Sequence, residues 1–543
     1  MDGRGSDFFI MIIFAPKKNI IMMKKIFILC ILTMLTIVQA KAYDFYALNN
    51  AGVKIYYEIQ AGIGNRVMVV SREGSSPAYS GVVNIPDQVT YEGVQYVVEA
   101  IGSGAFERSW ELTEVILPPN IKTIRERAFY QCPKLKGIII PDKVTSIRYY
   151  AFYDCDELRT VSLGAGLTEI GERAFNSCEV LESVTFGNKV SLIGSEAFSI
   201  CPKLKNVILP ESLEEIGYAA FSATGLTSIT IPNSVHSIHG YAFSSCGYME
   251  QAVIGDNVSF VEGFAFFSCS KLKKFIVSEQ NKNYSSEDGI LVSKDKTILV
   301  NYPNGKSTFS IPASIKVIGK EAFAGCDLRE ITIPENVDSI GPEAFSNCSN
   351  LKSVIFPENL KIIADRAFQY NYAIDSIVIP DNVVSIGAYA FSSCSRLDYL
   401  IIGKNVKEIG ICAFEGSYMK LVFNKNPIPQ IVEDIGMLDY HTSVFVPVGS
   451  GDLYKNANYW RTFNIVEYEY VVANESIINE DITMFNTTDG ITVNSSLPTT
   501  VAVYSISGQM VYQKYMRDRL DIKLQRGIYI VKAGDVTKKM YVK

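Results

Sequence analysis

The hydrophobic positions along most of the chain recur in one short pattern. In residues 351–356 apolar side chains occupy the first, fourth and sixth positions, which predicts a short strand with one buried face. Pro357 ends this strand, because proline fixes φ and has no N–H to donate. A second extended piece follows at residues 360–363. Ala367-Phe368 is then predicted to lie on a short helical turn, with alanine allowing close approach and phenylalanine filling the interior.

The Ala-Phe segment marks an internal repeat. Its phenylalanine occurs thirteen times from Phe106 onward at steps of 22 or 23 residues, apart from one gap of 57 residues between Phe266 and Phe323. A single unit cannot bury its apolar edge, so thirteen units at this period predict a repeat solenoid that is stabilised by stacking. After Phe106, the phenylalanines expected to form an interior ladder are Phe129, Phe152, Phe175, Phe198, Phe221, Phe243, Phe266, Phe323, Phe345, Phe368, Phe391 and Phe414.

Nine of the eleven cysteines lie three residues after a repeat phenylalanine. They are Cys132, Cys155, Cys178, Cys201, Cys246, Cys269, Cys326, Cys348 and Cys394. The same position holds Ser109, Thr224, Asn371 and Ser417 in the other units. A position that accepts these types requires a small group that can hydrogen-bond the backbone, not a disulfide partner. We therefore expect a structural ladder of free, buried thiols.

The fifth position of each repeat strand is predicted to point outward, and it is mostly β-branched and apolar. A candidate binding ledge follows along these positions: Ile116, Ile139, Ile208, Thr230, Val253, Ile276, Thr332, Ile355, Val378 and Ile401. One interpretation is strand propensity with lateral stacking along the sheet. The other is a long apolar ledge on which an extended ligand docks, since contiguous exposed apolar surface is typical of interaction sites.

With these residues established, the pattern Leu-x-x-Ile-x-Ile-Pro…Val-x-x-Ile-Gly-x-x-Ala-Phe-x-x-Cys resembles the BspA-type leucine-rich repeat family of bacterial surface proteins. The resemblance covers residues 99–423 and implies a solenoid of the leucine-rich-repeat type, built of β-strands and short helical turns. The long gap, about residues 278–311, resembles a hairpin island inserted in such arrays. Residues 43–98 are then an all-β N-terminal cap, and residues 424–473 a C-terminal cap of the solenoid.

The tail at residues 474–543 differs from the repeats. Apolar strands separated by glycine turns predict a small C-terminal β-sandwich. The stretches 503–509 and 527–529, with the basic Lys538-Lys539, resemble the C-terminal sorting domains of type IX secretion. That resemblance implies the secretion machinery as a partner. A solvated β-module with no special role is the alternative.

Residues 1–42 are interpreted as a start extension plus a signal peptide. Met23-Lys24-Lys25 is a positively charged start, residues 26–38 form an apolar run, and Ala40-Lys41-Ala42 fits a cleavage site. This run is too short to span a bilayer, so no transmembrane span is expected in a mature chain that begins at Tyr43. We expect translation to start at Met22 or Met23.

Composition narrows the function further. The 543 residues carry a net charge of −6, which argues against nucleic acid as a partner, and three histidines leave little room for histidine chemistry. No catalytic, cofactor-binding or metal site is expected. The prediction is a non-enzymatic, adhesin-like protein at the cell surface or secreted. Its partner is a host or microbial surface macromolecule, a protein in preference to a glycan. The alternative is a protein that captures polysaccharide or nutrients.

Overall fold

A computed structural model describes residues 43–62, 64–71, 79–306, 309–432, 434, 436, 442–468, 482–487, 490–495, 499–505, 510–533 and 536–542. The predicted signal peptide lies outside these residues. The chain divides into two units, residues 1–226 and 227–543. No helix within the described segments is long and apolar enough to cross a membrane.

The first unit begins with a β-rich cap. Its strands are β1 (Phe45–Leu48), β2 (Lys54–Ile59), β3 (Arg66–Val70), β4 (Ser80–Asn84), β5 (Gln88–Tyr91) and β6 (Val94–Ile101). The β1–β2–β3 pairs are antiparallel, whereas β3 pairs parallel with β6 and β4 parallel with β7. The cap thus passes from hairpin pairing to the parallel pairing of the repeats, and it covers an otherwise open sheet edge.

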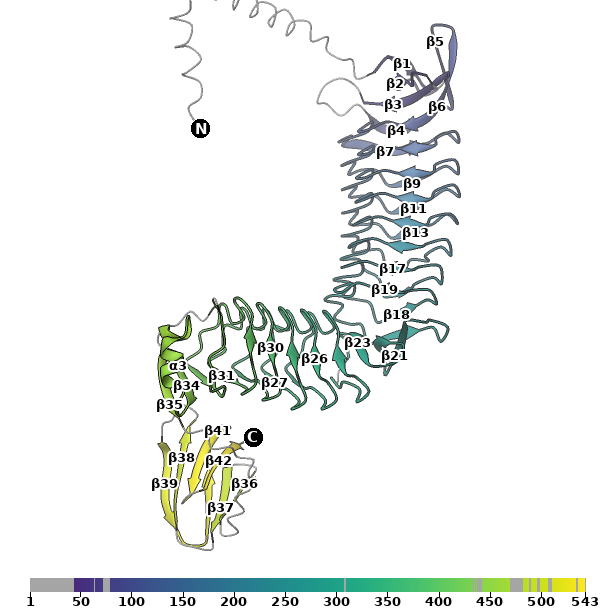
Figure 1. The fold of residues 1–543 in the computed structure, drawn as a ribbon. Coiled ribbons are helices and arrows are strands. Elements are labelled where there is room, and N and C mark those ends of the chain that lie inside the picture. The colour runs from purple at the N-terminus through teal and green to yellow at the C-terminus, as the bar shows by residue number, and fades with distance from the viewer. Residues whose placement is uncertain are drawn as a thin grey trace, which may run out of the picture. The chain divides into compact units, whose positions relative to one another are not determined.

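Stacked coils follow, most of them with two short strands (Figure 1). The coil of Ile208 has only the second of these, because residues 204–210 are not a strand. The first strand row of this unit contains β7 (Glu111–Ile116), β9 (Gly137–Ile139), β11 (Thr160–Ser162) and β13 (Ser183–Thr185). The second strand row contains β8 (Thr123–Ile124), β10 (Ser146–Ile147), β12 (Glu169–Ile170), β14 (Leu192–Ile193) and β15 (Glu215–Ile216). Neighbouring strands of a row are parallel and in register one repeat apart, as in Val161 with Ile138 and Val184. The solenoid predicted from the repeat is therefore confirmed.

The second unit also has two strand rows. Its first strand row contains β16 (Ser228–Thr230), β18 (Gln251–Ile254), β20 (Lys274–Val277), β25 (Glu330–Thr332), β27 (Ser353–Ile355), β29 (Ser376–Val378) and β31 (Tyr399–Ile402). Its second strand row contains β17 (Ser237–Ile238), β19 (Phe260–Val261), β24 (Val317–Ile318), β26 (Ser339–Ile340), β28 (Ile362–Ile363), β30 (Ser385–Ile386) and β32 (Glu408–Ile409).

The segment between two of these coils forms a small meander. Its strands are β21 (Tyr284–Glu287), β22 (Ile290–Ser293) and β23 (Ile298–Asn301). The β21–β22 and β22–β23 pairs are antiparallel, and β23 then pairs parallel with β24. Because β23 pairs with β24 of the second strand row, the insertion is part of the stacked sheet and is not a separate hairpin on its surface.

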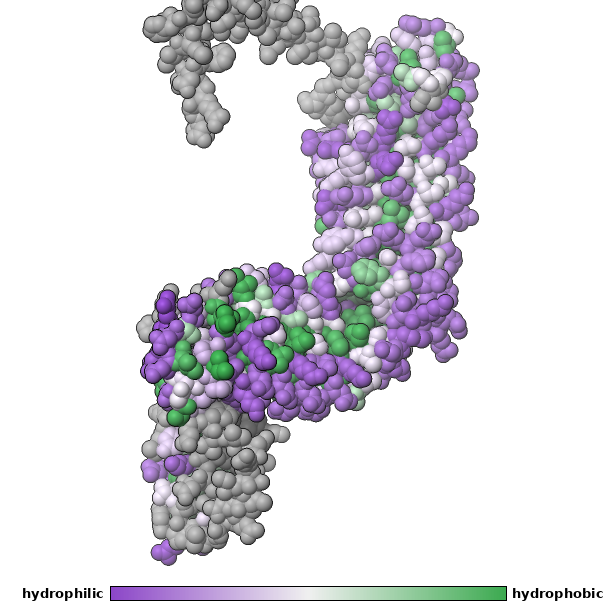
Figure 2. Space-filling model, in the orientation of Figure 1, coloured by the Kyte–Doolittle hydropathy of each residue, from purple (hydrophilic) through white to green (hydrophobic). Residues whose placement is uncertain are grey.

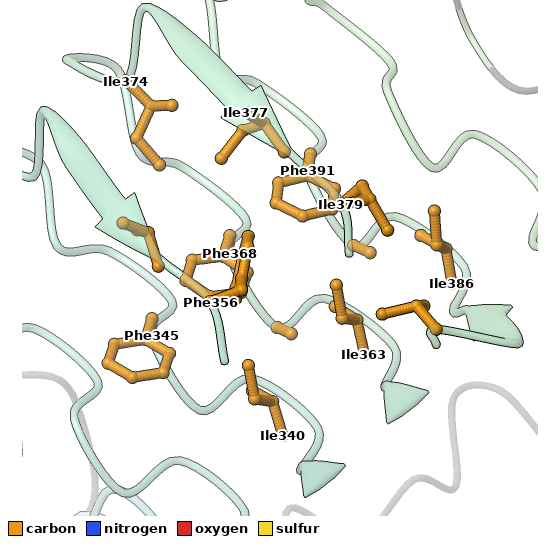
Figure 3. Packing of buried hydrophobic residues seen from close by; sticks show 14 of the residues in the cluster. Ile340, Phe345, Phe356, Ile363, Phe368, Ile374, Ile377, Ile379, Ile386 and Phe391 are labelled. Carbon is orange, nitrogen blue, oxygen red and sulfur yellow. The ribbon is translucent and has the colours of Figure 1, made fainter. Parts of the chain in front are cut away.

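The repeat phenylalanines line the interior of both units, and every one is at most 2% exposed. In the first unit the Phe129 and Phe152 ring centroids are 4.8 Å apart with nearly parallel planes. Figure 3 shows the same arrangement in the second unit, where Phe345, Phe368 and Phe391 lie in a row beside Ile340, Ile363 and Ile386. Ring stacking at the coil spacing thus contributes to the apolar interior of the coils, and the buried residues from Ile290 to Phe463 form one cluster.

The prediction of a short helical turn at each Ala-Phe is wrong, because these segments are tight turns. The N–H groups of Phe129 and Gln131 donate to Ala151 and Tyr153 of the next coil, at 2.7 and 2.8 Å. Only the alternate N–H groups close local turns, as in Tyr130 to the carbonyl of Arg127. A helix would need every N–H for its own turns, so bonding between coils excludes it.

The repeats end in a closing segment. It contains β33 (Leu421–Asn424), β34 (Ser443–Pro447), α3 (Gly451–Asn456), η1 (Trp460–Thr462) and β35 (Asn464–Tyr468). The fully buried Trp460 donates from Nε1 to the carbonyl of Gln430 at 3.1 Å, and Tyr454 donates from Oη to the carbonyl of Asn426 at 2.8 Å. These two hydrogen bonds connect α3 and η1 to the loop that follows β33.

The tail forms two antiparallel sheets. One contains β36 (Ile482–Thr487), β37 (Gly490–Ser495) and β40 (Arg519–Lys523), and the other contains β38 (Thr499–Ser505), β39 (Met510–Met516), β41 (Gly527–Ala533) and β42 (Val536–Val542). Buried residues of both sheets, such as Val493 and Val531, belong to one hydrophobic cluster. A shared core between two sheets is the arrangement expected of a small β-sandwich.

Candidate functional site

The first strand row presents an apolar ledge to solvent. Side chains alternate between the two faces of a strand, so the fifth repeat position points away from the buried Val and Ile positions. Ile139 is 75% exposed, Ile208 88% and Ile355 59%. Figure 2 shows apolar residues gathered in groups on the visible face of the second unit. Burial of the alternate positions fixes the strand orientation, and that orientation exposes Ile139 and Ile355. The strand predicted around Ile208 does not form, although Ile208 itself is exposed.

The ledge positions are neighbours in the sheets of each unit. In the first unit Ile139 lies opposite Ser162, which lies opposite Thr185. In the second unit Thr230 pairs with Val253 and Val253 with Ile276, and Thr332 pairs with Ile355. The other members, Ile116, Ile276 and Val378, are each at least 40% exposed, Thr230 and Thr332 are exposed, and Val253 is half-buried. The ledge is thus apolar with intervening hydroxyl groups.

Ile401 is the one predicted ledge residue that the structure contradicts. Only 6% of its surface is exposed. It lies opposite Phe423 in the parallel pair of β31 and β33, and Phe423 in turn stacks on Phe445 at 4.6 Å. These rings stand beside Ile401 on the outer sheet face. Since the closing segment lacks the repeat signature, the sequence pattern did not connect them to the ledge.

The repeat cysteines are buried thiols with a common hydrogen bond. Cys132, Cys155 and Cys178 donate to the carbonyls of Phe106, Phe129 and Phe152 at 3.0 to 3.3 Å. Asn371 and Ser417 keep this bond: Asn371 Nδ2 donates to Phe345 O at 2.8 Å, and Ser417 Oγ to Phe391 O at 3.2 Å. Ser109 Oγ makes no hydrogen bond within the described residues, and Cys326 donates to Asn304 Oδ1 instead. This shared bond explains the choice of residue types and indicates a structural role. All ten cysteines in the described segments are free.

Burial raises the pKa of these thiols. The pKa is about 12 for Cys132, Cys201, Cys348 and Cys394 and well above its usual value for Cys155, Cys178 and Cys326. Because the thiolate is the reactive form, we expect at most one cysteine, the partly exposed Cys412, to react with a thiol reagent at pH 8 in the folded protein. The same assay after unfolding without reductant should show ten thiols, or eleven if Cys30 is retained. Two or fewer would contradict the free ladder.

Aromatic side chains gather at the turns around the Ala-Phe segments, and the sequence interpretation missed them. Tyr130 and Tyr153 each follow a repeat phenylalanine, one repeat apart, and their rings stack at 5.1 Å. The signal was therefore present as a 23-residue spacing of tyrosines. These tyrosines lie outside the strands, so the pattern of strand positions does not include them.

The chemical groups around the ledge are mainly apolar or hydroxylated. Within the described part of the chain no group of three or more His, Cys, Asp or Glu side chains could hold a metal ion. His239 Nδ1 lies 3.6 Å from Glu262 Oε2 on a turn, and both are partly exposed. What the ledge offers chemically is apolar contact along a row of parallel strands.

A comparison with family models identifies the repeat. A family model described as the BspA type leucine rich repeat region (6 copies) matches residues 93–205, 168–287 and 302–421, more than half of the chain. No curated protein matches.

Solved structures also match. A leucine rich cell surface protein from Faecalibacterium prausnitzii is 25% identical over 67% of this chain and 90% of its own, with a TM-score of 0.48. The pneumococcal vaccine antigen PcpA is 22% identical over 79% of this chain and 99% of its own, with a TM-score of 0.49. A leucine-rich repeat protein from Bacteroides ovatus is 21% identical over 79% and 100%, with a TM-score of 0.38.

Proposed function

Since the chain belongs to the BspA-type leucine-rich repeat family, we propose that it is a non-catalytic, exported binding protein at the cell surface. Its ledge docks an extended segment of a host or microbial protein. The observation that carries this proposal is the solvent exposure of Ile139 and Ile355 on strands whose alternate positions are buried.

An extended protein ligand suits the ledge for physical reasons. Parallel coils repeat at about 4.8 Å, so the exposed apolar positions form a row and not a closed pocket. A row of this kind matches a ligand that buries alternate apolar side chains along its length, and burying apolar surface is the main source of binding free energy. The hydroxyl groups of Ser162 and Thr185 beside Ile139 supply polar partners within the same row.

Placing a charge on the ledge should abolish docking. We expect Ile139→Asp to weaken binding by about 10- to 100-fold, because the carboxylate would be desolvated against an apolar ligand surface. The full chain would be tested by surface plasmon resonance against collagen, laminin and fibronectin. The control is Asn188→Asp, which adds the same charge at an exposed turn of the first unit. Equal loss in both variants, or no protein ligand at all, would contradict the ledge proposal.

The tail supports export as part of this proposal. From Val501 onward the sequence carries nine basic and three acidic residues, and its strands form the two sheets described above. We expect deletion of residues 474–543 to leave the remaining chain in the periplasm, as detected by fractionation and immunoblotting, because a sorting domain is recognised by the secretion machinery. Normal delivery of the truncated chain to the cell surface would identify the tail as a β-module without a sorting role.

Capture of polysaccharide is the second candidate function. Exposed aromatic rings on the sheet face would have favoured it, but the exposed ledge residues are aliphatic or hydroxylated. The observation that favours it lies elsewhere, at the turns around Tyr130 and Tyr153.

A further inference from the structure

Exposed aromatic side chains are concentrated on one edge of the coils. Among the described residues, nine aromatic side chains are counted as exposed, and seven of them lie within five residues of a ladder phenylalanine. These seven are Trp110, Tyr149, Tyr218, Tyr248, Tyr370, Tyr372 and Tyr418. The sheet face and the turn edge therefore expose different chemistry, aliphatic on the first and aromatic on the second.

The densest group occupies two successive coils of the first unit. The stacked rings of Tyr130 and Tyr153 are 5.1 Å apart, and Tyr150 lies 5.3 Å from Tyr153. Tyr149 is 48% exposed and stands perpendicular to Tyr150, at 5.8 Å and 85°. Two rings at a right angle form an aromatic corner with one ring largely open to solvent.

Two arginines hold this group in place. The guanidinium of Arg127 lies 4.3 Å from the Tyr130 ring and donates to Glu107 at 2.6 Å. Arg173 lies 5.4 Å from the Tyr150 ring, donates to Tyr150 Oη, and donates from Nε and Nη2 to Glu196 at 2.9 and 2.6 Å. The hydrogen bonds to these carboxylates raise the pKa of both arginines. Each guanidinium is therefore fixed, and its five N–H donors are not all used by these bonds.

Planar polar groups continue beside the stacked tyrosines. Gln131 Nε2 donates to Asp154 at 2.9 Å, and Arg108 Nε donates to Gln131 at 3.2 Å. These residues occupy the same position of three successive coils, one residue after Tyr130 or Tyr153 in two of them. Aromatic faces and planar hydrogen-bonding groups thus run side by side along the coil axis.

This combination matches the chemistry of a sugar chain. The C–H groups of a pyranose ring are weakly positive and pack on the negative face of an aromatic ring, and adjacent hydroxyl pairs match the fork of a guanidinium, amide or carboxylate. The edge is open and repeats with the coils at about 4.8 Å, which suits a polymer better than a single sugar. The arginines are balanced by Glu107 and Glu196, and also by Glu172 at 3.4 Å, so the surface carries no excess positive charge for an acidic ligand.

We propose that this tyrosine–arginine corner, made of Arg127, Tyr130, Tyr149, Tyr150, Tyr153 and Arg173, is a binding site for a neutral polysaccharide. It is separate from the ledge and takes a different class of ligand. Tyr149 supplies the open stacking face, Tyr150 the wall of the corner, and the two arginines the hydroxyl-binding groups.

Affinity electrophoresis of the full chain tests the site with defined probes. The gels contain yeast mannan, barley β-glucan, xylan or, as the acidic probe, heparin. We expect at least one neutral polysaccharide to retard the protein, equally at low and high salt. Tyr149→Ala should weaken that binding about tenfold, since the open stacking face is lost. The matched control is Tyr218→Ala, because Tyr218 occupies the same repeat position and is 49% exposed, but is followed by Ala219 in place of Tyr150.

Three results would overturn the proposal. They are binding to none of the neutral probes, equal weakening by Tyr149→Ala and Tyr218→Ala, and retardation by heparin alone that salt abolishes. Circular-dichroism melting of both variants checks that the fold is kept, and Tyr153→Ala provides a second variant within the corner. No protein ligand is present in these gels, so the outcome is independent of docking on the ledge.

Discussion

Phe152→Ala is expected to lower the free energy of unfolding by about 3 to 5 kcal/mol. The Phe152 ring is fully buried and lies between the rings of Phe129, at 4.8 Å, and Phe175, at 5.0 Å. Alanine would remove one member of the row and leave a cavity that the flanking coils cannot close. Their spacing is fixed by backbone bonds such as Phe152 N–H to Ala174 O at 2.7 Å. Urea unfolding followed by circular dichroism measures the loss.

Two further substitutions are expected to cost less unfolding free energy than Phe152→Ala, and they serve as its controls. Phe152→Leu keeps most of the buried volume and should cost less than half as much. Ile139→Ala removes an apolar side chain that is largely exposed, so its effect should stay within about 0.5 kcal/mol. If Phe152→Ala cost no more than Ile139→Ala, the phenylalanine row would not be the stabilising core of the stack.

Tyr302→Ala is expected to cost a similar amount, about 3 to 5 kcal/mol, although Tyr302 lies outside the repeat pattern. Its side chain is 1% exposed and its ring lies 4.7 Å from Phe323, next to Phe309 at 5.4 Å. Its N–H donates to Ala322 O at 2.8 Å, as the N–H of Phe323 donates to Ala344 O. Tyr302 therefore takes the place of a ladder phenylalanine where the inserted meander interrupts the repeats.

Tyr302→Phe distinguishes the contribution of the ring to stability from that of the hydroxyl group. It keeps the stacked ring and loses the hydroxyl that accepts from the Ser310 N–H at 3.3 Å, so a cost of about 1 kcal/mol is expected. Burial raises the pKa of Tyr302 to about 12, and its absorbance should therefore not change below pH 11 in the folded protein. Titration of Tyr302 near pH 10, or equal destabilisation by Tyr302→Phe and Tyr302→Ala, would contradict its place in the row.

Most of the architecture followed from periodicity. Because each coil repeats the same bonds with its neighbours, a phenylalanine every 22 or 23 residues places one ring per coil in the interior, and the pattern alone predicted the solenoid. The cysteine position was also informative, since its replacement by Ser, Thr or Asn indicated a hydrogen bond and not a disulfide. Both inferences depended on comparing many copies of one local environment.

Contacts that do not recur from coil to coil could not be predicted from the repeat pattern, and only the tertiary structure shows them. Ile401 fits the ledge pattern, but Phe423 from the closing segment lies beside it and buries it. The Ala-Phe turns are not helical because half of their N–H groups bond to the next coil. Tyr302 could not be recognised as a ladder residue, because its sequence context shares nothing with the other units.

The repeat period thus determined which side chains face inward, since every coil must bury the same edge to stack. The same period placed the ledge positions on the outer face of the strands, as the exposure of Ile139 and Ile355 shows. The groups that side chains outside the strands form were left to the structure. The exposed Tyr149 and the half-buried Tyr150 do not recur as a pair from coil to coil, and the neighbours of Tyr150 include Tyr130 and Arg173 from the adjacent coils, which only folding brings together. The interior and the strand ledge could therefore be inferred from the sequence, whereas the tyrosine–arginine corner was decided by the tertiary structure.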